Sequence, residues 1–336
     1  MVRDEKYFMQ MALDKAWAYQ GLTYPNPPVG AVITDAKDNF ISHGVHEYAG
    51  GPHAEVNAIK SAYKKLTNDS KIDAIKNSIE IHEYLSKNHN CIFNDKTIYV
   101  TLEPCNHYGK TPPCANLIVE LGFKKVFIGT RDPNKTASGG VDKLIENGLH
   151  VELGVLGKKC KSLIEPFMLW QEETFVFFKL AMSTNGVIDG GTVTCTESRK
   201  MVHAIRNKID LLVIGGNTVR VDRPTLDARL CNGRAPDVLI YSKNKEFDKN
   251  IPLFSVPNRK VFIKDNFDKI NDYNFVMIEG GEGMLNEVKK FVNWFLIFRS
   301  PHFKNGFSPS LEISLKEEFS VSIGEDRLSW FTKLNE

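Results

Sequence analysis

Short runs of β-branched and aromatic residues alternate with helix-like segments along most of the chain, and this alternation constrains the fold more than any other feature. In the first half, the apolar runs predict strands at residues 29–33, 97–102, 125–129 and 150–153. The remaining segments there predict helices at residues 5–19, 53–65, 115–121 and 139–147. A second series of strands is expected at residues 175–180, 211–214, 238–241, 260–263 and 275–278. Such alternation is typical of α/β domains in which helices cover a sheet.

The length of the chain, 336 residues, suits two domains of ordinary size. Because the second series of strands begins near residue 175, we expect a first domain at 1–172 and a second at 173–336. Residues 66–96 are polar and rich in Lys, Asn and Asp, so we expect them to form a surface insertion in the first domain.

Charged residues are nearly balanced, with 43 Lys and Arg against 41 Asp and Glu. Proteins that bind nucleic acid through bulk charge usually carry a strong basic excess, so the composition argues against that class. The first ten residues contain acidic side chains and no apolar core of a signal peptide. No apolar run approaches the roughly 20 residues that a membrane span needs. We therefore expect a cytoplasmic protein with no nucleic-acid or membrane partner and with reduced cysteines.

Three side chains of the first domain have the chemistry of zinc ligands: His53, Cys105 and Cys114. One imidazole and two thiolates suit Zn²⁺, and a set of three leaves the fourth tetrahedral position to water. Both cysteines can lie at helix N-terminal ends, where the helix dipole favours the thiolate. Glu55 follows His53 by two residues, so its carboxylate can approach the same metal and move protons without binding it. Zinc-dependent nucleobase deaminases use this combination of residues.

Each part of the pattern is weak alone, because a histidine at a helix start is often a cap and isolated cysteines are often small core residues. The joint pattern is much rarer. A structural zinc in a nucleic-acid-binding module is the alternative from another class of protein, and it predicts a fourth ligand and a basic groove with aromatic residues. The charge balance and the missing fourth ligand weigh against it.

The segments NP at 26–27, GPHAEV at 51–56 and LEPCNHYGKTPPC at 102–114 resemble the RibD family of bifunctional deaminase–reductases of riboflavin biosynthesis. Eight residues separate the two cysteines, whereas most zinc nucleobase deaminases have Cys-x-x-Cys. The wider spacing is similar to that of the riboflavin-type deaminases. The resemblance implies an α/β protein with a cytidine-deaminase-like three-layer α/β/α domain, followed by a dihydrofolate-reductase-like α/β domain.

For the first domain, the resemblance implies zinc-dependent hydrolytic deamination of 2,5-diamino-6-(5-phosphoribosylamino)pyrimidin-4-one, a small-molecule pyrimidine ribosyl phosphate. Glu55 would move the protons at the zinc ion. The residues expected to contact this substrate are Asn26, His46, His107 and Lys110.

For the second domain, two glycine-containing segments follow expected strands, at 214–226 and 278–285. Glycine permits close approach of the backbone, and N–H groups at a helix start can hold phosphate. No Gly-x-Gly-x-x-Gly is present, which argues against an ordinary Rossmann domain. The two segments resemble the reductase half of the same family, which implies NADPH-dependent reduction of the ribosyl group to ribityl.

The resemblance also implies the contacts of that second reaction. The residues expected at NADPH are Ala181, Thr218, Asp222, Ser242, Gly281, Glu282, Gly283, Met284, Leu285, Asn286 and Glu287. The residues expected at the substrate are Arg206, Leu226, Arg229 and Glu279. A homo-oligomer joined through the reductase domains is expected on the same ground.

Two positions depart from the family pattern. Gly190-Gly191-Thr192 occupies a place where the family commonly has Ser-x-Trp, and Asn185 replaces a usual acidic residue. These departures leave an alternative open, in which the chain is a zinc pyrimidine deaminase whose second domain binds substrate but no longer reduces it.

Overall fold

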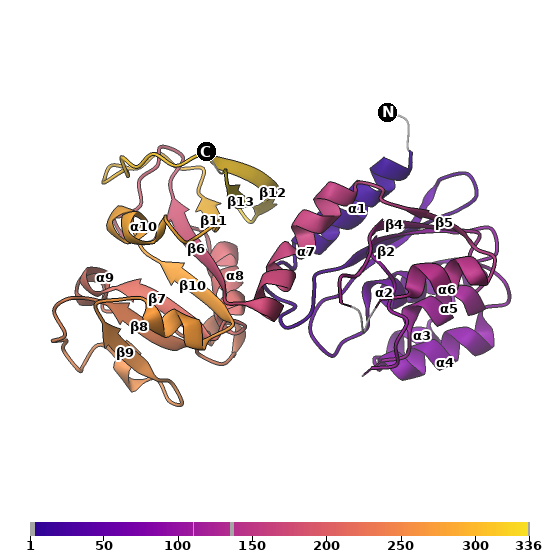
Figure 1. The fold of residues 1–336 in the computed structure, drawn as a ribbon, viewed down its shortest axis with the longest axis horizontal. Coiled ribbons are helices and arrows are strands. Elements are labelled where there is room, and N and C mark those ends of the chain that lie inside the picture. The colour runs from indigo at the N-terminus through magenta and orange to yellow at the C-terminus, as the bar shows by residue number, and fades with distance from the viewer. Residues whose placement is uncertain (1–3, 110, 135–137, 335–336) are drawn as a thin grey trace. The chain divides into compact units, whose positions relative to one another are not determined.

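The computed structural model describes residues 4–109, 111–134 and 138–334. It divides into two compact units, Met1–Phe167 and Met168–Glu336. Each unit has its own β-sheet with helices packed against it (Figure 1). Among the described residues, no helix combines the length and the apolar composition needed to cross a membrane.

The first unit is built on a five-stranded mixed sheet in the order β2-β1-β3-β4-β5. The strands are β1 (Gly30–Thr34), β2 (Phe40–Val45), β3 (Thr97–Leu102), β4 (Lys125–Thr130) and β5 (His150–Leu153). Strand β1 is antiparallel to β2 and β3, whereas β3, β4 and β5 are parallel. Every residue of β1 and β3 is buried, as expected for strands covered on both faces.

Helices cover both faces of this sheet and give the three layers expected from the sequence (Figure 1). The helices of this unit are α1 (Glu5–Trp17), α2 (Ala54–Thr67), α3 (Lys71–Ala74), α4 (Ser78–Asn88), α5 (Cys114–Glu120), α6 (Gly140–Glu146) and most of α7 (Gly157–Glu172). On one face, Phe8 of α1 packs against Tyr99 of β3. On the other face, α2, α5 and α6 share a core with alternate residues of β1, β3 and β4.

The segment 66–96 is more than the surface insertion that its composition predicts. Its helix α4 has one buried face, which packs against α2 and α5, and its helix α3 buries Ile72. Its buried side chains join the main core of the unit and are Ile72, Ile81, Leu85 and Phe93. The segment therefore supports the two helices that begin at the candidate zinc ligands.

A close backbone contact fixes α2 on the sheet. A Cβ atom added at Gly44 of β2 would lie 2.2 Å from the amide nitrogen of Ala58 and 2.3 Å from the carbonyl oxygen of Ala54. Any other residue at position 44 would push α2 away from the sheet, because real Cβ contacts are never this short. Since the first turn of α2 carries Glu55, this glycine determines where that carboxylate lies.

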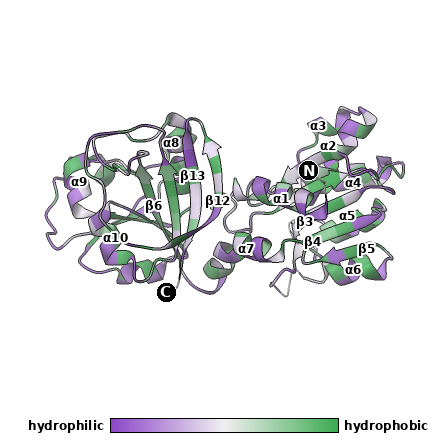
Figure 2. Ribbon diagram, turned by 90° about the horizontal axis from the view of Figure 1, so that it is seen from above, coloured by the Kyte–Doolittle hydropathy of each residue, from purple (hydrophilic) through white to green (hydrophobic). Residues whose placement is uncertain are grey.

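The second unit contains an eight-stranded sheet in the order β12-β13-β11-β6-β10-β7-β8-β9. The parallel strands are β6 (Phe175–Met182), β7 (Leu211–Gly215), β8 (Asp237–Tyr241), β9 (Val261–Lys264), β10 (Phe275–Glu279) and β11 (Trp294–Arg299). The antiparallel hairpin consists of β12 (Leu315–Ile323) and β13 (Asp326–Lys333). The helices are α8 (Thr196–Arg206), α9 (Gly216–Asp222) and α10 (Glu282–Val288). Strand β6 is largely hydrophobic (Figure 2), as a strand covered on both faces should be.

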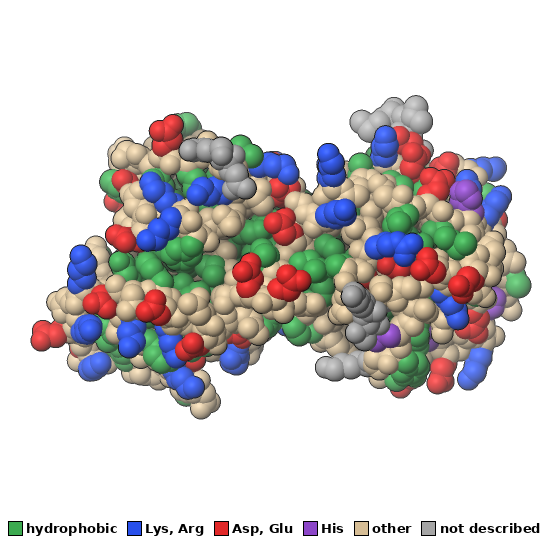
Figure 3. Space-filling view, viewed as in Figure 1, with side chains coloured by type: hydrophobic (Ala, Val, Ile, Leu, Met, Phe, Trp, Pro, Cys, Tyr) green, Lys and Arg blue, Asp and Glu red, His purple; other side chains and the backbone are tan. Residues whose placement is uncertain are grey.

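Charge is dispersed over the surface that Figure 3 shows. Acidic and basic side chains are interspersed on this face, with no large area of a single sign. This distribution agrees with the near balance of charges in the sequence.

The C-terminal hairpin caps a helix that comes more than a hundred residues earlier. Oδ2 of Asp326, at the start of β13, accepts hydrogen bonds from the amide of Cys195 at 2.8 Å and from Oγ of Ser198 at 2.6 Å. Cys195 is the N-cap residue of α8 and offers no side-chain cap of its own. The buried carboxylate of Asp326 thus gives an acceptor to the N-cap amide of α8 and to the Ser198 hydroxyl in its first turn.

Replacing this carboxylate should destabilise the second unit. We expect Asp326→Ala to lower the free energy of unfolding by about 2 kcal/mol, because a buried amide and hydroxyl lose a charged acceptor. Chemical denaturation followed by tryptophan fluorescence measures the change. Glu325→Ala is the matched control, since the Glu325 side chain is 74% exposed. Equal stability of the two variants would contradict the capping role.

Candidate functional site

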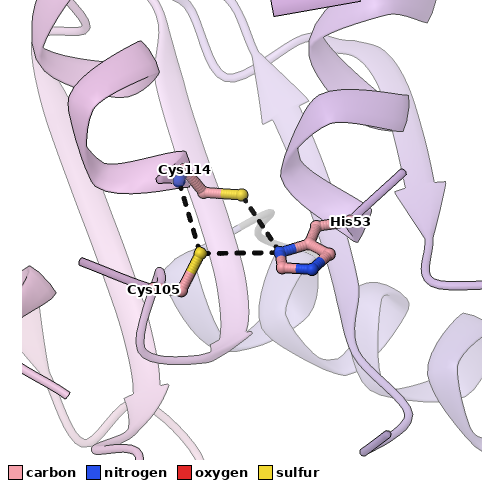
Figure 4. A group of neighbouring side chains, drawn as sticks. All are labelled: His53, Cys105 and Cys114. Carbon is pink, nitrogen blue, oxygen red and sulfur yellow. Dashed lines mark hydrogen bonds between the residues drawn. The ribbon is translucent and has the colours of Figure 1, made fainter. Parts of the chain in front are cut away.

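Three side chains from separate parts of the first unit converge on one point (Figure 4). His53 directly precedes α2, Cys114 begins α5, and Cys105 lies in the loop after β3. Nδ1 of His53 lies 3.5 Å from Sγ of Cys105 and 3.4 Å from Sγ of Cys114, and all ligand atoms lie within 4.8 Å of one another. Tetrahedral ligands about 2.0–2.3 Å from one zinc ion have similar separations. The cluster therefore fits Zn²⁺.

The cluster has the composition of an open site. In the described part of the chain, no fourth His, Cys, Asp or Glu belongs to it. Three protein ligands leave one tetrahedral position for water or substrate, which is the arrangement of a catalytic zinc site. The alternative of a structural zinc, which requires a fourth protein ligand, lacks that ligand among the described residues.

Glu55 lies in the first turn of α2 and is 4% exposed. Burial raises the pKa of Glu55 to about 7, and the neighbouring His53 imidazole partly opposes this rise. A carboxyl group whose pKa is near neutrality can both accept and release a proton at physiological pH.

The two cysteines differ in their local structure. Cys114 lies at the start of α5, but Cys105 lies in a loop, so the prediction that both occupy helix ends is wrong for Cys105. Sγ of Cys105 instead accepts a hydrogen bond from the backbone amide of Cys114 at 3.4 Å. The Cys114 thiol and then the His53 ring hold the pKa of Cys105 below its usual value, although burial opposes them. This environment favours the thiolate that binds metal.

Glu103 fixes the loop that carries Cys105. Its Oε1 accepts hydrogen bonds from the amides of Gly139 at 3.0 Å and Val141 at 2.9 Å, and its Oε2 accepts one from the amide of Asp132 at 3.0 Å. The buried carboxylate thereby joins the end of β3 to the start of α6. The sequence analysis missed this role, although a carboxylate directly after a buried strand is the signal that could have revealed it.

The remaining nitrogen of His53 has a hydroxyl neighbour. Oγ1 of Thr111 lies 3.4 Å from Nε2 of His53, on the opposite side of the ring from the thiols. Metal-binding histidines usually donate their other N–H to such an acceptor, which fixes the tautomer and the orientation of the ring. Thr111 is buried, so water competes little for this position.

Two of the predicted substrate residues lie beside the cluster. Nδ2 of Asn26 lies 3.0 Å from Nε2 of His46, and the rings of His46 and His53 meet edge to face at 5.5 Å. Nδ1 of His46 lies 3.1 Å from the carbonyl oxygen of Pro52, which can only accept. His46 therefore carries its proton on Nδ1 and accepts from Asn26 through Nε2. Burial lowers the pKa of His46 to about 4, so the ring is neutral at physiological pH.

The other two predicted substrate residues of this unit lie in the loop between the cysteines. Nδ1 of His107 is buried and has no hydrogen-bond partner among the described residues. Lys110 lies outside the described residues.

In the second unit, Arg206 and Glu279 form an ion pair. Nη2 of Arg206, the last residue of α8, donates to both carboxylate oxygens of Glu279 at 3.0 and 2.9 Å. Lys179 of β6 lies directly across from Glu279 of β10 in the parallel ladder. Burial lowers the pKa of Lys179, and Glu279 opposes this change. The sequence analysis missed Lys179 as a site residue, although a lysine inside an otherwise apolar strand was the available signal.

The other two predicted substrate residues of this unit lie in the loop after α9. Leu226 is buried and has a left-handed backbone with φ of 57°. Arg229 is exposed and donates to Oδ1 of Asp227 at 2.6 Å.

The residues predicted to bind NADPH lie at the ends of parallel strands and the starts of helices. Ala181 lies near the end of β6, Thr218 and Asp222 belong to α9, and Ser242 directly follows β8. Gly281 is the N-cap of α10, and Glu282 to Glu287 belong to that helix. Met284 and Leu285 pack into the hydrophobic core, and Leu285 also lines a cavity beside Gly281 and Glu282. Gly283, Asn286 and Glu287 are exposed.

Comparisons with known proteins agree with this division. A family model of the cytidine and deoxycytidylate deaminase zinc-binding region matches residues 2–130, and a model of the RibD C-terminal domain matches residues 174–302. The riboflavin biosynthesis protein RibD of Aquifex aeolicus is 30% identical over 386 residues, covering 99% of this chain and all of that protein. The chain belongs to the RibD family. Its first unit is a zinc-dependent deaminase domain and its second an NADPH-dependent, dihydrofolate-reductase-like domain.

Other RibD proteins support the same assignment. RibD of Synechocystis sp. is 35% identical over 234 residues, which cover 67% of this chain and 56% of that protein. The solved structure of the deaminase/reductase from Thermotoga maritima has a TM-score of 0.65 at 29% identity and covers 98% of this chain and 99% of that one.

One departure from the RibD pattern has a structural explanation. Oδ1 of Asn185 accepts from the amide of Lys304 at 3.0 Å, while its Nδ2 donates to the carbonyl oxygen of Lys304 at 2.8 Å. A carboxylate could accept the first bond but could not donate the second. Asn185 thus joins the loop after β6 to the segment after β11. Gly190 and Gly191 both have positive φ, at 78° and 90°, a backbone conformation that favours glycine, whereas nothing in the structure explains Thr192.

The position of Thr111 predicts an effect on metal affinity. We expect Thr111→Val to weaken zinc binding by about tenfold, because His53 loses the partner that orients its ring. Thr111→Ser keeps the hydroxyl and should bind zinc as the wild type does. Competition with a chromophoric chelator measures both affinities. Equal affinity of the Val and Ser variants would contradict the orienting role.

Proposed function

We propose that this chain catalyses two successive steps of riboflavin biosynthesis. The first is hydrolytic deamination of 2,5-diamino-6-(5-phosphoribosylamino)pyrimidin-4-one, and the second is NADPH-dependent reduction of the ribosyl group to ribityl. The observation that carries the proposal is the open cluster of His53, Cys105 and Cys114 with the buried carboxyl group of Glu55 on the same helix turn. We place the domains at 1–172 and 173–336, since α7 ends at Glu172.

In the first reaction, a zinc ion held by His53, Cys105 and Cys114 would supply an acidified water molecule. Glu55 takes up a proton from that water and later delivers a proton to the leaving amine, as its raised pKa allows. Asn26 and His46, held in a fixed mutual orientation next to His53, contact the pyrimidine. His107 and Lys110 contact the substrate from the loop between the cysteines.

In the second reaction, NADPH would supply a hydride to the anomeric carbon of the ribose. The bond between that carbon and the ring oxygen breaks, and the ring oxygen takes up a proton. Lys179 is suited to provide this proton, because its lowered pKa makes its ammonium group a stronger acid. Arg206 and Arg229 offer positive charge to the substrate phosphate, with Glu279 orienting Arg206 and Leu226 contacting the substrate. The residues that would contact NADPH are Ala181, Thr218 and Asp222 of α9, Ser242, and residues 281–287 at α10.

We also propose a homo-oligomer joined through the second unit and a cytoplasmic location. Strand β12 lies at an open edge of the sheet, where another strand can add. All six cysteines are free, which suits a reducing compartment.

The deaminase proposal predicts the effect of removing one carboxylate. We expect Glu55→Gln to reduce ammonia release by about a thousandfold, because the amide cannot carry the proton. The variant should retain one zinc ion per chain by metal analysis, and NADPH oxidation with deaminated substrate should be unchanged on the same polypeptide. Unaltered ammonia release would remove Glu55 from the mechanism.

The reductase proposal predicts a pH dependence. If protonated Lys179 is required, reduction should decline as the pH rises through its pKa, which lies below the ordinary value of 10.5. Lys179→Arg keeps the positive charge to higher pH but releases a proton far less readily, so it should lower the rate and move this decline upward. Absorbance of NADPH with deaminated substrate measures the rate, and ammonia release reports on folding at each pH.

If the Lys179→Arg variant has the same pH profile of reduction as the wild type, the proposed role of Lys179 is wrong. No NADPH oxidation by the wild type, with substrate binding retained, would favour the alternative of a deaminase whose second domain only binds substrate.

A further inference from the structure

Arg259, two residues before the start of β9, uses its guanidinium group to bind three backbone carbonyl groups. Nε donates to the carbonyl oxygen of Pro236 at 2.8 Å, and Nη1 donates to that of Thr225 at 2.8 Å. Nη2 donates to the carbonyl oxygen of Leu226. Burial lowers the pKa of Arg259 to about 10, so the group stays positively charged at physiological pH.

The loop that Arg259 binds has an unusual backbone. Arg223, Leu226 and Asn232 all have positive φ, at 45°, 57° and 51°. For a residue with a bulky side chain this left-handed conformation is unfavourable, because Cβ approaches the carbonyl oxygen too closely. Such conformations persist only where the surrounding structure holds them, and they are frequent at functional sites.

The two carbonyl groups that Arg259 binds in this loop flank Leu226. The carbonyl of Thr225 belongs to the peptide plane before the Leu226 Cα, and the carbonyl of Leu226 belongs to the plane after it. Rotation about φ or ψ of Leu226 moves one of these planes relative to the other. A rigid planar guanidinium bound to both therefore holds the left-handed conformation, and its third bond ties the loop to the segment leading into β8.

We propose that Arg259 is a positioning residue of the reductase site, which holds Leu226 and the following residues in the conformation that meets the substrate. This inference rests on the proposed function, which gives Leu226 and Arg229 to substrate binding. Leu226 and Ala228 are buried in the stretch that Arg259 anchors. Arg229 directly follows this stretch, and its side chain is exposed to solvent. The fixed backbone of the preceding residues thus determines the position of the Arg229 Cα atom, from which the side chain extends.

The test compares Arg259→Met, Arg259→Lys and a matched control, Arg234→Met. Arg234 also donates to a backbone carbonyl of the second unit, that of Ile209 at 3.2 Å, but it does not bind the carbonyl groups of the 225–226 stretch. For each variant, hydrogen–deuterium exchange by mass spectrometry follows the amides of residues 225–230. Steady-state kinetics give KM and kcat for deaminated substrate, and ammonia release by the first unit of the same chain serves as the internal control.

We expect Arg259→Met to speed amide exchange in the loop and to raise KM by about tenfold, which equals about 1.4 kcal/mol. The value of kcat should change less than KM, and ammonia release should not change. Arg259→Lys should lie between wild type and Arg259→Met, because an ammonium group keeps the charge but cannot reproduce the planar set of three donors. Arg234→Met should behave as wild type.

A folded Arg259→Met variant with unchanged loop exchange and unchanged KM would overturn the proposal. A lower kcat with an unchanged KM would also overturn the proposal. That result would mean that less of the variant is folded, while the loop in the folded molecules still binds the substrate as in the wild type. If Arg259→Met does not fold, Arg259→Lys is judged by the same two measurements. If the wild type itself oxidises no NADPH, the proposed reductase function is wrong. In that case, amide exchange that is unchanged in the Arg259 variants would independently show that Arg259 does not fix the loop conformation.

Discussion

The zinc cluster depends on backbone contacts that leave no space for a side chain. Gly44 lets the first turns of α2 lie directly on β2, and this contact sets the place of His53 and Glu55. On the other side of the cluster, a Cβ atom added at Gly140 would lie 1.8 Å from the carbonyl oxygen of Pro104, so α6 supports the loop of Cys105 equally closely. Metal ligands must be placed within a few tenths of an ångström. Close contacts between backbones hold the ligands in place more rigidly than contacts between flexible side chains.

The sequence predicts the zinc site better than the reductase site, and the reason is chemical. Few combinations of side chains bind zinc, so His53, Cys105 and Cys114 could be selected from the chain before their proximity was known. Arginines and glutamates have many roles, and the Arg206–Glu279 pair joins residues far apart in the chain that no local pattern connects. Hydrogen bonds to backbone carbonyls, such as those of Arg259, leave no signal in the sequence at all.

Most of the elements that the sequence analysis missed have mixed patterns, although the apolar strand β11 was missed as well. Strand β2 has a short and irregular alternation, and α7 contains Pro166 within the helix, which argues against a helix from sequence alone. The hairpin of β12 and β13 has many polar residues, because it lies toward the edge of its sheet. Long apolar strands such as β3 and β10 were predicted nearly to the residue, since both of their faces are buried.

The cap that Asp326 provides for α8 has a consequence for synthesis of the chain. One end of α8 is anchored by the last hairpin, and the other end carries Arg206. During translation, the anchoring carboxylate emerges from the ribosome after every strand of the parallel sheet. The reductase half therefore reaches its native arrangement only after its last hairpin has emerged, whereas the deaminase half can mature while the rest is still being made.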